Sequence, residues 1–159
     1  MKKGLFIFFI LFIIGSGFIF GQSAPGFDNS VDFAVSMKEL DKLLKTGKTE
    51  NLESKYLILN GAVSSYTVTD KEEASYTVEV ELVNGEWSGV ADVFIYRSII
   101  VFKGRQYMEK FPERRRSTLS PEEIPINSGL IIVAKYSGNR KMGNMNIPVL
   151  DGYYLRIYK

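Results

Sequence analysis

The chain has 159 residues and a formal net charge of +2, and it contains neither cysteine nor histidine. This length fits one compact domain without a second sizeable core. Disulfides, thiolate and imidazole metal sites, Ser-His-Asp triads and Cys-His nucleophiles are excluded by composition, so we expect no cofactor, no metal and no enzyme of the familiar classes.

The N-terminal segment has the pattern of a secretory signal peptide. Two lysines precede an apolar run over Leu5–Ile14, and small residues follow it. We expect cleavage after Ser23 or after Gly21, and hence a periplasmic or secreted protein with residues 1–23 as the signal. Removing that segment removes two lysines and no acidic residue, so the mature domain is neutral. A neutral domain lacks the overall positive field that supports sequence-independent binding of nucleic acid.

An uncleaved anchor is the alternative for the same segment. Residues 4–20 are mostly apolar and lie at the lower limit of length for a membrane span. Only in that case do we expect the membrane as a partner.

One helix precedes the strands. Residues 24–35 read as a flexible leader, because turn-forming residues are frequent there. Ser36 and Glu39 then form a capping-box pattern, leucines follow at helical spacing, and Gly47 provides a stop. We predict an amphipathic helix over residues 36–46, at the start of a domain that spans 36–159.

Two strands and a hairpin turn are expected next. Tyr56–Val68 reads as a strand with a bend at Gly61. Ser75–Val83 alternates, with Tyr76, Val78, Val80 and Leu82 on one face. Asn84-Gly85 is a strong two-residue turn signal, so we predict that Ser75–Val83 pairs antiparallel with Trp87–Tyr96 through it.

The remaining chain adds further strands around a long connection. After a β segment at Ile99–Phe102, a basic and aromatic connection runs from Gly104 to Leu119, and Ser120–Pro125 predicts about one turn of helix. Leu130–Tyr136 is expected as a strand, 137–144 as a turn, and Ile147–Tyr158 as the last strand. The prediction is therefore a mainly β domain: a small five-stranded Greek-key barrel of the OB type, with an N-terminal helix and a short helical turn between strands three and four.

A family resemblance supports the same fold. The helix leucines Leu40, Leu43 and Leu44, followed by a polar spacer and Lys55–Val63 with its tyrosine, glycine and valine, resemble the tRNA-anticodon-like OB families of bacteria. The resemblance would cover residues 36–158. It implies an exported OB domain and implies fold more than function.

One basic segment carries the predicted ligand site. Cations interleaved with aromatic rings are what single-stranded nucleic acids or anionic glycans require. The candidate ligand-binding residues are Arg97, Lys103, Arg105, Tyr107, Phe111, Arg114, Arg115 and Arg116. The competing interpretation, which we favour, is structural: the acidic stretch Asp70–Asp92 neutralises these cations across the domain surface.

Two other groups of side chains have a possible functional and a structural interpretation. Glu79 and Glu81 share a strand face and could act as paired carboxylates of a hydrolase, but a solvated face is the preferred interpretation. The aromatic strands around Trp87–Tyr96 and Tyr153–Tyr158 are expected to supply mainly core, with an outward platform for sugar or peptide as the alternative.

The sequence therefore predicts an exported, non-enzymatic binding or structural domain of the envelope. Its partner could be an anionic polymer, a glycan or an envelope protein, and an OB module for nucleic acid or a carboxylate hydrolase are the alternatives.

Overall fold

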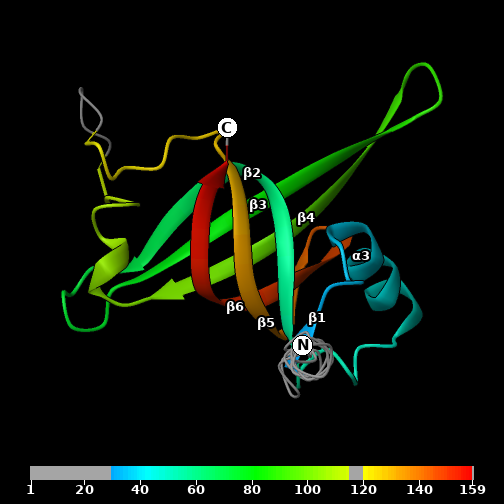
Figure 1. The fold of residues 1–159 in the computed structure, drawn as a ribbon, viewed down its shortest axis with the longest axis horizontal. Coiled ribbons are helices and arrows are strands. Elements are labelled where there is room, and N and C mark those ends of the chain that lie inside the picture. Colours follow the sequence, from blue (N-terminus) through cyan, green and yellow to red (C-terminus); the bar gives the residue numbers. More distant parts are fainter. Residues whose placement is uncertain (1–29, 115–119, 159) are drawn as a thin grey trace, which may run out of the picture.

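The computed structural model describes residues 30–114 and 120–158. The expected signal peptide, residues 24–29 of the expected leader, Arg115 and Arg116 lie outside the described residues. The described chain is mainly β, as predicted (Figure 1). Its elements are β1 (Val31–Asp32), α3 (Met37–Thr46), β2 (Tyr56–Asp70), β3 (Thr77–Ser88), β4 (Asp92–Lys103), the 3-10 helix η1 (Arg105–Tyr107), β5 (Gly129–Met142) and β6 (Met145–Tyr158).

The strands form one sheet whose ends meet. Their order is β1-β2-β3-β4-β6-β5, and β2 also pairs with β5, so the five long strands make a ring of hydrogen bonds. The β1–β2 and β4–β6 pairs are parallel, and the other pairs are antiparallel. The count is six rather than the expected five because the two-residue β1 adds to β2.

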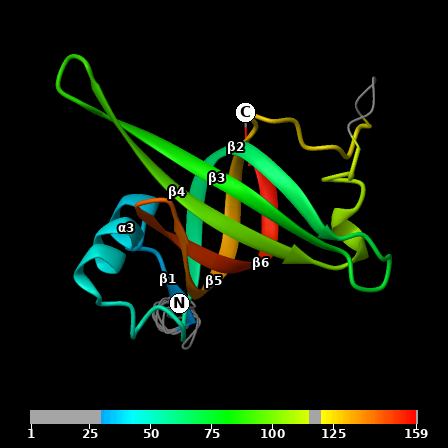
Figure 2. The same cartoon turned by 180° about the vertical axis from the view of Figure 1, so that it is seen from behind.

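The core lies inside this ring. The predicted alternation is confirmed, since Tyr76, directly before β3, and Val78, Val80 and Leu82 within it are all buried. Met37 and Leu40 of α3 join the same core, as do Tyr107 and Phe111 of the connection between β4 and β5. α3 and that connection lie at opposite ends of the ring, as both views show (Figures 1 and 2). Each end of the apolar interior is thus covered by a different part of the chain.

The predicted helix is present. The Ser36 hydroxyl accepts a hydrogen bond from the Glu39 amide at 3.2 Å, and Gly47 ends the helix in the left-handed conformation.

The expected flexible leader, residues 24–35, includes residues that belong to the folded domain. Within it, Val31 and Asp32 pair with β2, and Val31 and Val35 are buried. Burial of these two valines makes residues 31–35 part of the folded domain.

The predicted antiparallel hairpin of the second and third long strands exists, but both its turn and its pairing were wrong. Ser75–Val83 does not pair with Trp87–Tyr96, because Thr77–Val83 lies opposite Arg97–Lys103. Asn84 and Gly85 lie within β3, opposite Tyr96 and Ile95, and the chain reverses at residues 89–91. The core explains the shift. Placing Val78 and Val80 opposite Phe102 and Ile100 buries all four side chains, and that register requires a longer hairpin.

Two further turns differ from expectation. β5 continues to Met142 through an irregularity near Gly138, so most of the expected turn at 137–144 is strand. Residues 121–124 form no helix; the helical turn of the connection is η1 instead. The Ile124 amide donates to the carbonyl of Lys110, 14 residues earlier in the same connection, at 2.9 Å. This amide therefore does not take part in a helical turn.

Candidate interaction surface on the hairpin arm

The predicted ligand-binding rings are not available to a ligand. Tyr107 is 6% exposed and Phe111 is fully buried. Both rings lie against Phe102, at centroid distances of 4.7 and 6.1 Å. They hold the connection onto the core, so the expectation that they stack on a ligand is wrong.

The predicted cations are dispersed and paired. Arg97 lies 2.7 Å from Glu81 on the sheet, Lys103 lies 3.7 Å from Asp151, and Arg105 lies 2.6 Å from Glu73. Arg114 is exposed. The first and third of these pairs join the basic segment to the acidic stretch, which agrees with the structural interpretation of that segment. The described members of the predicted site do not form one cluster.

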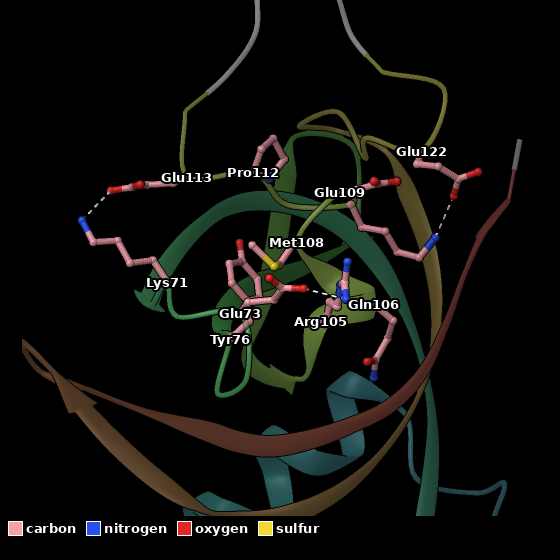
Figure 3. A pocket seen from close by; sticks show the side chains of 11 residues that line it. Lys71, Glu73, Tyr76, Arg105, Gln106, Met108, Glu109, Pro112, Glu113 and Glu122 are labelled. Carbon is pink, nitrogen blue, oxygen red and sulfur yellow. Dashed lines mark hydrogen bonds and ion pairs between the residues drawn. The ribbon is translucent and has the colours of Figure 1, made fainter.

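A hollow of about 950 Å³ lies between the β2–β3 turn and the β4–β5 connection (Figure 3). Its three cations are each paired: Lys71 with Glu113, Arg105 with Glu73, and Lys110 with Glu122. Glu109 adds a further negative charge. Paired cations and an acidic excess disfavour an anionic ligand in this groove.

The two strand carboxylates considered for hydrolysis are also paired. Arg140 donates two hydrogen bonds to Glu79, at 2.6 and 2.7 Å, and these hold the pKa of the Glu79 carboxyl below its usual range. Glu81 accepts from Arg97 at 2.7 Å and from Ser65 at 3.0 Å. A general acid requires a raised pKa, so this geometry gives no support to a carboxylate hydrolase. In residues 30–114 and 120–158, no three acidic side chains gather as metal ligands would.

The aromatic strands place many of their rings outside the core. Trp87, Phe94, Tyr153, Tyr154 and Tyr158 are all exposed, which overturns the expectation that they mainly form core. They lie on two parts of the sheet. Three tyrosines lie on β6, where the Tyr158 ring covers Gly129 so closely that a Cβ there would meet it at 2.8 Å. The others lie on the β3–β4 hairpin.

That hairpin projects beyond the sheet. β2 pairs with β3 only as far as Val83, and β6 pairs with β4 only from Ile99 onward. Residues 84–96 therefore have strand partners only within the hairpin, and Figure 1 shows them extending away from the body. We refer to residues 84–96 as the arm.

The arm exposes large apolar side chains. Trp87 is 73% exposed, Phe94 is 55% exposed, and Val90 at the tip is fully exposed. Val93 and Ile95 are also exposed, and Val93 lies directly opposite Trp87. Large apolar side chains exposed together in this way typically mark an interaction site.

The arm is braced against α3. Lys38 of the helix lies 2.8 Å from Glu86 of the arm, and the hydrogen bond between them raises the pKa of Lys38 and lowers the pKa of Glu86. The Tyr96 hydroxyl donates to the same carboxylate at 3.3 Å. Two hollows lie where the arm meets the helix, with volumes of about 300 and 420 Å³, and Phe94 lines both. The exposed apolar groups are therefore presented in a defined position.

Comparison with known proteins finds no family model that matches the sequence and no similar curated protein. Within the described ranges, none of the helices has the length and apolar character needed to cross a membrane.

Proposed function

We propose that the protein is an exported, non-enzymatic domain that binds another protein of the cell envelope through its arm. The observation that carries this proposal is the exposure of Trp87, Val90, Val93, Phe94 and Ile95 on a hairpin that projects from the body. Aromatic side chains such as those of Trp87 and Phe94 are common anchors of protein interfaces, because they bury much area at a low cost in entropy.

The fold we propose for the sheet is an OB-type Greek-key barrel. The ring order of the five long strands and the helical turn between β4 and β5 support it. The fold does not decide the ligand, since OB domains serve many functions. The arm is an extension of the second and third long strands, so it can be tested separately from the barrel.

A protein partner is favoured over an anionic polymer or glycan. The arm carries Glu86 and Asp92, and Lys38 beside it is already paired with Glu86. Nucleic acid or an anionic glycan would require unpaired cations next to the exposed rings. Export is part of the proposal on the strength of the N-terminal pattern alone, and N-terminal sequencing of the exported protein tests it.

Site-specific photo-crosslinking in the cells that make the protein tests the binding proposal. A benzoylphenylalanine is placed at Val90 or Trp87 on the arm, and at Glu72 in the exposed β2–β3 turn as the matched control. We expect one protein adduct from the arm positions that Glu72 does not give. If the arm positions give no protein adduct, or the same adducts as Glu72, the proposal is wrong.

A further inference from the structure

The arm leaves one edge of β4 without a strand partner. β4 and β6 are parallel neighbours from the Ile99–Val149 pair onward, but residues 92–98 of β4 pair only with β3. In a strand paired on one side, every second residue directs its backbone N–H and C=O away from that partner. Such an edge is a template for another strand.

The same stretch borders the hollow of about 420 Å³. Its walls are residues 94–97 of β4 and residues 144–147 around the start of β6, and Leu44 of α3 also lines it. Residues 145–148 of β6 pair only with β5, so a second edge borders the hollow as well. Pro148 removes one N–H donor from the β6 edge, which leaves β4 as the better template.

The charges around this hollow are already compensated. Asp41 lies 2.6 Å from Lys45, and Arg97 lies 2.7 Å from Glu81. The other lining side chains are apolar or uncharged: Leu44, Phe94, Ile95, Tyr96, Met145 and Ile147, with Asn144 and Asn146. A ligand that brought an unpaired charge would lose hydration without gaining a partner.

We propose that an extended segment of the partner protein adds as a strand to the edge of β4 between Asp92 and Arg97. The edge ends there because Ser98 is buried and its hydroxyl contacts the Met37 sulfur of α3. The uncharged, alternate side chains of the added strand enter the hollow beside Met145. This inference rests on the proposed function and specifies how the partner is recognised: main-chain hydrogen bonds give affinity, and the hollow selects alternate side chains. Insertion of the arm into lipid is disfavoured, because Glu86 and Asp92 near its tip would lose their hydration.

The test uses the protein recovered from cells that express all 159 residues. It is screened against a displayed library of random nine-residue peptides, and the tightest binder is resynthesised with one backbone nitrogen methylated at a time. Strand addition predicts that every second methylation weakens binding by about tenfold, since each removes one hydrogen bond to β4, while the intervening ones have little effect. Uniform tolerance or uniform loss along the peptide would overturn the inference.

A matched pair of variants locates the bound peptide. Met145 lines the hollow, whereas Met142, its partner across the β5–β6 turn, does not line it, and both are exposed. We expect Met145→Glu to weaken the peptide by about tenfold and Met142→Glu to leave it nearly unchanged. Failure to recover any peptide that depends on Met145 would overturn strand addition.

Two further results separate this inference from the proposed function. If the protein self-associates in sedimentation experiments and Met145→Glu alone abolishes the association, a second copy occupies the edge and the inference is wrong. If peptide binding shows no alternation while Val90 still gives its specific adduct, the arm binds a protein in another way. Loss of the Val90 adduct would instead refute the proposed function itself.

Discussion

Removal of the Tyr76 hydroxyl tests how the β4–β5 connection is held on the core. Tyr76 is buried, and its hydroxyl donates to the carbonyl of Phe111, whose ring is also buried. Tyr76→Phe removes the donor, keeps the ring and leaves that carbonyl without this partner. The cost of an unsatisfied buried acceptor is about 1–3 kcal/mol, so we expect the free energy of unfolding to fall by that amount.

Urea unfolding of both proteins measures this loss, and an unchanged m-value would show that the unfolding transition still exposes the same surface. Tyr66→Phe is the matched control. The Tyr66 hydroxyl donates to the Pro112 carbonyl at 3.1 Å in a partly buried position, where water can replace the lost donor. We expect the control to cost less than about 1 kcal/mol. Equal losses in the two variants, or a loss below about 0.5 kcal/mol for Tyr76→Phe, would refute this account of the connection.

The raised pKa of Tyr76 predicts how the free energy of unfolding falls at alkaline pH. Burial raises the pKa of Tyr76, with smaller contributions from Tyr66 and from the charge of Glu113. Because the folded state favours the neutral phenol, its contribution to stability is complete below the pKa of an unfolded tyrosine, about 10. It is lost as the pH rises through the higher pKa of the folded state. Stability measured from pH 9 to 12 should therefore decline less in Tyr76→Phe than in the unmodified protein, and parallel curves would contradict this assignment.

Two further predictions concern the sheet. A Cβ at Gly152 would lie 2.3 Å from a ring carbon of Phe102, so Gly152→Ala should lower the free energy of unfolding in urea by about 1–3 kcal/mol. Gly85→Ala in the arm is the control and should cost far less, because the nearest atom to its Cβ would be 3.5 Å away. The Glu79–Arg140 pair should couple by about 1 kcal/mol in a double-mutant cycle with Glu79→Gln and Arg140→Gln at pH 7. Arg140 lowers the pKa of Glu79 in the folded state. The coupling energy is therefore complete above the ordinary carboxyl pKa of about 4, and it disappears as the pH falls through the lower pKa of the folded state. A coupling energy that persists at pH 2 would contradict this prediction.

Local signals in the sequence predicted the elements that depend on local chemistry. Ser36 and Gly47 bound the helix as expected, because a cap acts within one turn of the chain. The alternation from Tyr76 to Leu82 identified the buried face of β3, because one face of that strand meets the core. Both signals need only residues that are close in the sequence.

The turn at Asn84-Gly85 was wrong because its local preference competes with the register of the whole hairpin. Shortening the hairpin to that turn would remove Ile100 and Phe102 from their places opposite Val80 and Val78. Two large buried side chains contribute more free energy than a favourable turn dipeptide. A turn dipeptide therefore predicts the turn only where a hairpin centred on it also places the buried residues of the two strands opposite one another.

The arm could not be located from sequence because exposure of a strand depends on where its neighbours stop. Residues 93–96 are a run of four apolar side chains without alternation, which is typical of a strand buried on both faces. In the structure β2 ends its pairing at Val83 and β6 begins at Ile99, so the run extends past both neighbours and three of its four side chains are exposed. A run of this kind outside the core costs solubility in the free protein, and an interface that covers it removes that cost. The partner we propose therefore supplies on β4 the neighbour that this run lacks within its own chain.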